Sequence, residues 1–159
     1  MGFQTQVNAT PALAVAGDFA SANPRAAVVA GEGGFIAGAG GVTVGRFAWI
    51  DADGKTLLNT GTGKPDGFVH REQQALISTY LAEGSNLIPA GFPVTLMRTG
   101  DYYATSTVAA ADKGEKAFAK LADGTMQPAA AGATVATYIE TDFTISRAAG
   151  IGELAVITL

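Results

Sequence analysis

The sequence contains no cysteine and only one histidine, His70, among its 159 residues. The absence of cysteine excludes a disulfide framework, a thiol nucleophile and thiolate ligands for a metal ion. A single histidine also excludes a zinc site that is built on several imidazoles. We therefore expect no metal and no cofactor in this protein.

Charge is scarce as well. Charged residues make up 15% of the chain, the formal net charge at pH 7 is -4, and the pI is about 4.8. A protein that binds the phosphate backbone of nucleic acids needs a basic surface, so nucleic acid is not an expected partner. The most apolar stretch, residues 26–48, is interrupted by Glu32, Arg46 and several glycines. A membrane span is therefore not predicted, and the N-terminus lacks the basic start of a signal peptide.

In place of charge the chain carries 31 alanines and 21 glycines, and its mean hydropathy is +0.24. A surface with this composition is neutral and has few long side chains. Such a surface suits a broad contact with another protein better than it suits isolation in solvent.

Short segments rich in β-branched and aromatic residues alternate with turn signals through most of the chain, at intervals of about 8 to 12 residues. This pattern predicts a mainly β protein, a small antiparallel sandwich or barrel. The dipeptides Asp53-Gly54 and Asp123-Gly124 are each typical of a tight hairpin turn. The expected strands cover residues 26–30, 35–37, 42–50, 55–59, 93–98, 102–108, 116–121, 125–127, 134–146 and 153–159.

Residues 1–25 are predicted to form an extended N-terminal arm, and residues 26–159 a single β-rich domain. Pro11 and Pro24 interrupt regular structure in the arm. The arm is either a frayed terminus or an extended segment that lies on a neighbouring surface. The second interpretation is favoured by apolar side chains that a purely disordered tail would lack. These are Phe3, Val7, Leu13, Val15 and Phe19.

One short helix is predicted at residues 71–83. Its apolar side chains recur at helical spacing, and the polar residues before them favour a helix. The apolar positions are Leu76, Ile77, Tyr80 and Leu81.

The segment Phe68–Gln74 holds the densest polar chemistry of the chain. His70, with Glu72 behind it, has the composition of a general base and its orienting acid. No serine or cysteine motif in the sequence supplies a nucleophile for such a pair. We therefore expect His70, Arg71 and Glu72 to brace the fold or to contact a partner subunit, and we do not expect an enzyme.

Two further patterns have simpler interpretations than a ligand site. Glu140 and Asp142 lie on one face of an expected strand, where they suit a cation or acid–base chemistry, but a solvated strand face is the simpler interpretation. Aromatic side chains can form a platform for sugars, but the hydrophobic core takes such residues more often. The aromatic candidates are Trp49, Tyr80, Tyr102 and Tyr103.

A last pattern extends over nearly the whole chain and thins after residue 110. It consists of residues 15–21, 23–25, 30–33, 41–49, 67–76 and 88–91, together with Val94 and residues 100–101. These stretches, in this order, resemble the capsid decoration proteins of phages and prophages, which are called structural cement proteins.

The resemblance implies a non-enzymatic virion protein that is made in the cytoplasm of the host bacterium and sits on the outer surface of an icosahedral head. It implies binding to the major capsid protein, which stabilises contacts between capsid subunits, and self-association as a dimer or trimer. The alternative is a virion-surface β module that binds carbohydrate or the host. Contact with the capsid or with a sister subunit is expected for Phe3, Val7, Leu13, Val15, Phe19, His70, Arg71 and Glu72.

Overall fold

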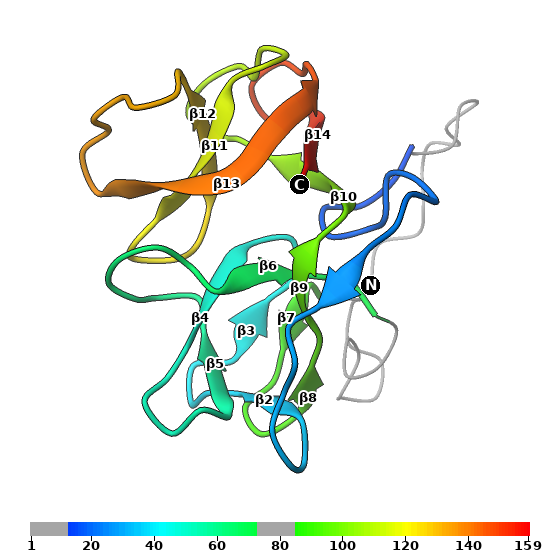
Figure 1. The fold of residues 1–159 in the computed structure, drawn as a ribbon, viewed down its shortest axis with the longest axis vertical. Helices are drawn as coiled ribbons and strands as arrows, with labels where there is room; N and C mark the ends of the chain where they lie inside the picture. The colour runs from blue at the N-terminus through cyan, green and yellow to red at the C-terminus, as the bar shows by residue number, and fades with distance from the viewer. Residues whose placement is uncertain (1–12, 73–84) are drawn as a thin grey trace, which may run out of the picture.

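The computed structural model describes residues 13–72 and 85–159, and all regular structure in these residues is strand (Figure 1). In chain order the strands are β1 (Ala26–Ala27), β2 (Phe35–Ala37), β3 (Val42–Thr43), β4 (Phe47–Ile50), β5 (Thr56–Leu58), β6 (Gly67–Val69), β7 (Leu87–Ile88), β8 (Pro93–Val94), β9 (Leu96–Thr99), β10 (Asp101–Thr105), β11 (Lys116–Lys120), β12 (Met126–Ala129), β13 (Tyr138–Arg147) and β14 (Leu154–Thr158). The predicted mainly β fold class is therefore confirmed.

The strands form two large sheets and one small one. The first large sheet has seven strands in the order β1-β9-β6-β4-β5-β2-β8, and the second has five in the order β10-β14-β13-β11-β12. The strands β3 and β7 pair with each other. Figure 1 shows the five-stranded sheet stacked above the other strands, and the turn at Gly100 carries the chain from β9 in one sheet to β10 in the other.

The pairing corrects two details of the predicted fold. Neither large sheet closes on itself, so the sandwich alternative describes the fold and the barrel alternative does not. Most neighbouring strands are antiparallel, as predicted, but β2 and β5 run parallel, with Ile36 opposite Thr56 and Ala37 opposite Leu57.

Four aromatic rings fill the space between the two large sheets, and we call Phe47, Phe68, Tyr102 and Phe143 the aromatic cluster. All four side chains are buried, and each of the two sheets contributes two of them. The Phe47 and Phe68 rings meet edge to face with centroids 5.3 Å apart, and the Phe68 and Tyr102 centroids are 5.4 Å apart. Aromatic pairs favour such tilted arrangements, and full burial of one such side chain stabilises a fold by about 1.5–3 kcal/mol.

A second buried cluster is built by the first half of the chain together with the segment that follows residue 85. Its members are apolar, and most come from strands of the seven-stranded sheet or from the small sheet. They are Phe35, Ala37, Val42, Val44, Ala48, Leu57, Val69, Ile88, Val94 and Leu96. The seven-stranded sheet therefore has a core of its own, and the aromatic cluster is the core that it shares with the five-stranded sheet.

The expected strand at residues 42–50 is broken in the middle, which the β-branched composition did not predict. Residues 44–46 separate β3 from β4, and Gly45 there has φ of +75°. A Cβ atom on Gly45 would lie 2.7 Å from Cβ of Ala16 and 2.8 Å from its carbonyl carbon. The break therefore lets the N-terminal segment approach the backbone closely, which a continuous strand with side chains would prevent.

The helix predicted at residues 71–83 lies almost wholly outside the described residues. Arg71 and Glu72 are described and have no regular structure, and residues 73–83 fall in the part that is not described. None of the described residues forms a helix long and apolar enough to cross a membrane.

The two predicted hairpins at Asp-Gly pairs are both observed, and they provide a matched test of how the sheets are joined. Gly54 and Gly124 have nearly equal φ angles of +69° and +68°. A Cβ on Gly54 would meet nothing within 4 Å, whereas a Cβ on Gly124 would lie 2.1 Å from the carbonyl oxygen of Phe47. The turn between β11 and β12 therefore presses its backbone against β4 of the other sheet.

We expect Gly124→Ala to destabilise the fold much more than Gly54→Ala. Both variants place alanine in the left-handed region, which costs about 1–2 kcal/mol. Only Gly124→Ala also forces the two sheets apart, and we expect that to add at least about 2 kcal/mol. Urea denaturation followed by circular dichroism measures both losses, and equal losses would show that the Gly124 contact does not hold the sheets together.

Candidate functional site

The N-terminal segment of the described chain lies along both large sheets, and we call residues 17–28 the strap. Beside β10, the Gly17 amide donates to the carbonyl of Tyr103 at 2.8 Å, and the Ala20 amide donates to that of Asp101 at 2.9 Å. An antiparallel bridge joins Phe19 to Tyr102 between these two bonds. The first part of the strap thus acts as an additional edge strand on the five-stranded sheet.

The second part of the strap pairs with the other large sheet. Ala26 lies opposite Thr99 on β9, and the Val28 amide donates to the Leu96 carbonyl at 2.8 Å. Since β9 and β10 are consecutive in the chain, the strap runs antiparallel to one continuous ribbon that passes between the sheets. In Figure 1 the strap is the blue segment beside β10 and β9. It therefore bridges the two sheets at their common edge.

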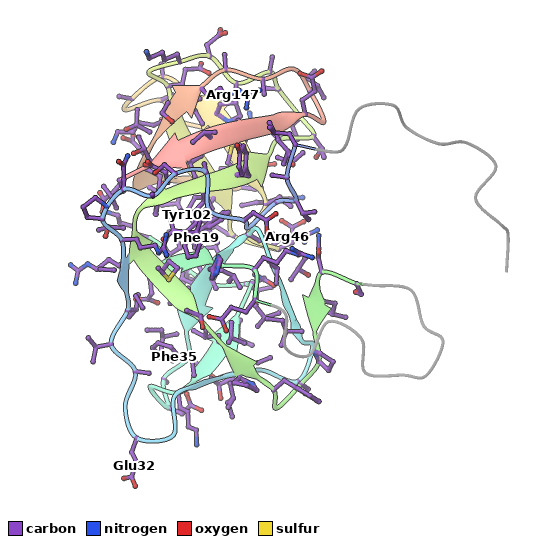
Figure 2. The ribbon with its side chains drawn as sticks, turned by 90° about the vertical axis from the view of Figure 1, so that its right-hand side faces the viewer. Phe19, Glu32, Phe35, Arg46, Tyr102 and Arg147 are labelled. Atoms are coloured by element: carbon purple, nitrogen blue, oxygen red, sulfur yellow. The ribbon has the colours of Figure 1, made fainter. Side chains whose placement is uncertain are left out.

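Phe19 anchors the strap to the core. Its ring stacks on the ring of His70, with centroids 3.8 Å apart and planes at 22°, and its centroid is 5.6 Å from that of Tyr102. The Arg25 guanidinium carbon lies 3.8 Å from the Phe19 centroid, the geometry of a cation–π contact. Figure 2 shows Phe19 and Tyr102 together at the level where the two halves of the molecule meet.

His70 binds the strap through its Nδ1 atom, so this nitrogen is not free to act as a base. Its Nδ1 lies 2.9 Å from the carbonyl oxygen of Gly17. Because a carbonyl oxygen only accepts hydrogen bonds, this contact requires the proton on Nδ1. Of the two interpretations left open by the sequence, the structure gives His70 the bracing contact within its own chain.

The neighbours of His70 make similar contacts. The backbone amide of Arg71 donates to the same Gly17 carbonyl at 2.9 Å. The Nη1 atom of the Arg71 guanidinium pairs with Oδ1 of Asp18 at 3.1 Å. The Glu72 carboxylate accepts a hydrogen bond from the Thr95 hydroxyl at 2.5 Å. His70 and Arg71 thus contact residues 17–19, which lie more than 50 positions earlier in the chain. We call this set of contacts the strap joint.

Asp101, the first residue of β10, binds the strap beside the strap joint. Its carboxylate accepts hydrogen bonds from the hydroxyl of Ser21 at 2.5 Å, the side-chain amide of Asn23 at 2.6 Å and the hydroxyl of Thr158 at 2.5 Å. The bond from Ser21, followed by that from Thr158, holds the pKa of Asp101 below its usual value, although partial burial opposes the shift. Asp101 therefore ties the strap to β14 as well as to its own strand.

The remaining predicted contact residues divide into two groups. Leu13 and Val15 are 61% and 37% exposed, so they present apolar surface beside the strap. Phe3 and Val7 lie outside the described residues. Contact with a partner remains a prediction for all eight candidate residues, including the four that also make contacts within the chain, and so does the boundary between arm and domain at residue 25.

The other candidate ligand residues are engaged in the fold. The Glu140 carboxylate accepts a hydrogen bond from the Gly132 backbone amide at 2.7 Å. The Asp142 carboxylate pairs with the Lys64 ammonium at 2.5 Å. In the parts of the chain that the structure describes, no group of three or more histidine, aspartate or glutamate side chains is placed to hold a metal ion.

Two of the four aromatic candidates lie in the hydrophobic core, which is the interpretation that the sequence favoured over a platform for sugars. Trp49 is 5% exposed and its indole N–H donates to the Gly63 carbonyl, while Tyr102 is fully buried and its hydroxyl donates to the Thr99 carbonyl. Burial raises the pKa of Tyr102 to about 12. Tyr80 lies outside the described residues.

Comparison with known proteins gives one family and one shared fold. The family model described as XM1 gp53 minor capsid protein matches residues 3–159. A chain in the solved structure of the capsid of Myoviridae phage XM1 has the same fold, with a TM-score of 0.72 and 17% sequence identity. That similarity covers 99% of this chain and 97% of the other. No curated protein matches the chain.

The contacts of Asp101 generate a stability prediction. At neutral pH we expect Asp101→Ala to destabilise the protein by about 2 kcal/mol, since it removes three side-chain hydrogen bonds that are partly exposed to solvent. Because the pKa of Asp101 is lowered in the folded protein, its contribution is complete above the usual carboxyl value of 3.8 and is lost as the pH falls through the lower folded value. The difference in the free energy of unfolding between the parent and Asp101→Ala should therefore become smaller below pH 3.8.

Asp112→Ala is the matched control, because the Asp112 carboxylate makes no hydrogen bond or ion pair with any described residue. Unfolding in urea at neutral and acidic pH should show little change for this variant. A loss for Asp101→Ala no greater than that for Asp112→Ala would contradict the role of Asp101 in holding the strap.

Proposed function

This chain belongs to the XM1 gp53 minor capsid protein family, and from that premise we propose that it is a non-enzymatic decoration protein that cements a phage head. A structural role in the capsid follows from the family. The proposal adds that the chain binds the outer surface of the head and stabilises contacts between subunits of the major capsid protein. The match to the family over residues 3–159 is the observation that carries it.

The internal construction of the chain supports a mechanical role. A cement protein must keep its shape when the subunits that it touches are pushed apart. Here a buried aromatic cluster joins two sheets, and the strap pairs with both of them. A protein built in this way can transmit force between two contacts without first unfolding at the junction of its sheets.

Exposed apolar residues beside the strap support a contact surface. Val29, which directly follows the strap, is 93% exposed, and Leu13 is 61% exposed. Large apolar side chains that are so exposed lose contact with water when a partner covers them, which stabilises the complex. We propose that Leu13, Val15 and Val29 contact the capsid or a sister subunit, and that the chain acts as a dimer or trimer.

The energetics of cementing rely on repetition. A modest contact that recurs at many fixed positions on a shell resists expansion collectively, because each copy is held by more than one neighbour. A ligand that binds the intact shell and not its separated subunits stabilises the shell by mass action. The chain then needs no catalytic chemistry to affect the lifetime of the head.

Heads assembled without this chain should release their DNA at a lower temperature than complete heads. At a free protein concentration of 100 times Kd, binding contributes about 2.7 kcal/mol per site. Adding the purified chain back should therefore restore the release temperature. A dye that fluoresces on DNA measures the release during heating, and identical release temperatures with and without the chain would contradict the cement function.

A further inference from the structure

A groove of about 360 Å³ opens between the two large sheets. Its apolar lining includes Phe47 from β4 and Phe143 from β13. Val28, at the end of the strap, also lines it. Because both sheets contribute to its walls, only the assembled two-sheet body presents this groove.

Four charged side chains line the groove, and three of them are engaged. Lys64 and Asp142 pair with each other across the two sheets at 2.5 Å. The Asp66 carboxylate accepts a hydrogen bond from the Ile50 amide at 2.7 Å. Arg98 on β9 makes no side-chain hydrogen bond or ion pair with any residue in the described ranges 13–72 and 85–159. Within the described residues, the Arg98 guanidinium is thus without a polar partner beside an apolar lining.

We propose that this groove receives an acidic side chain from a neighbouring protein of the capsid shell, and that Arg98 binds its carboxylate. The proposal rests on the proposed function, because it names a contact through which the chain would hold the shell. A guanidinium presents a planar fork of N–H donors that matches the two oxygens of a carboxylate. The apolar lining suits the aliphatic part of a glutamate or an apolar neighbour of the acid.

The charge pattern of the groove favours a single carboxylate over a polyanion. Nucleic-acid backbones are bound by several lysines and arginines that act together. Here the two carboxylates of Asp66 and Asp142 also line the groove, so a chain of phosphates would meet like charge.

Charge reversal at Arg98 tests the proposal, with Arg147 as the matched control. Arg147 is exposed, has no side-chain partner among the described residues, and lies at the far end of the five-stranded sheet (Figure 2). Co-sedimentation of purified chain with heads that lack it gives the Kd. We expect Arg98→Glu to weaken binding about tenfold or more, while Arg147→Glu changes it by less than about twofold.

A second variant and two further measurements keep the outcomes separate. Arg98→Gln should also weaken binding, which shows that loss of the cation matters and not only the added negative charge. Both Arg98 variants should keep the melting temperature of the parent, since Arg98 is exposed and its side chain has no partner among the described residues. If the parent chain itself fails to bind heads, the proposed function is wrong.

If the parent binds and the Arg98 variants bind equally well, the groove is not a contact and this inference is wrong. Equal weakening by Arg98→Glu and Arg147→Glu would also overturn it, because general repulsion would then explain the loss. Sedimentation of the free chain completes the test. A change of oligomeric state in Arg98→Glu would assign the groove to a second copy of the chain and contradict a shell partner.

Discussion

The packing of four aromatic rings between the two large sheets is the interaction on which the rest of the structure depends. Most of the buried apolar side chains of the five-stranded sheet belong to the cluster that contains Phe47 and Phe68 of the other sheet. The strap extends the same packing outward, because Phe19 stacks on His70 and approaches Tyr102. The groove at Arg98 exists only while this contact holds the sheets together. The fold, the strap joint and the groove at Arg98 therefore all depend on the aromatic cluster between the two sheets.

Because the chain has few charged residues, it matters which of them stabilise the fold and which remain exposed to a partner. Several of its ionic groups secure the strap or the junction of the sheets, as in the Asp18–Arg71 pair, the Lys64–Asp142 pair and the hydrogen bonds to Asp101. What the surface presents is then mostly small and apolar, with single charges such as Arg98. This distribution fits a protein of the XM1 gp53 minor capsid protein family, which has a structural role in the capsid.

Local signals in the sequence predicted the β class, both Asp-Gly hairpins and several strands, because each of these depends on a few neighbouring residues. They did not predict the parallel pairing of β2 and β5 or the break at Gly45, which arise from packing between distant segments. The sequence marked Phe19 and His70 separately and could not show that they stack. Asp101 had no chemical signal of its own, although it falls within the stretches that carry the family resemblance, as do Ser21 and Asn23. The predicted helix lies outside the described residues and stays a prediction.

Cryo-electron microscopy of the assembled head tests the central claim most directly. The cement function predicts density for this two-sheet fold on the outer surface of the head, with each copy in contact with at least two subunits of the major capsid protein. It also predicts that the groove at Arg98 faces one of those subunits. Density on the inner surface, or copies that each touch a single capsid subunit, would contradict the account.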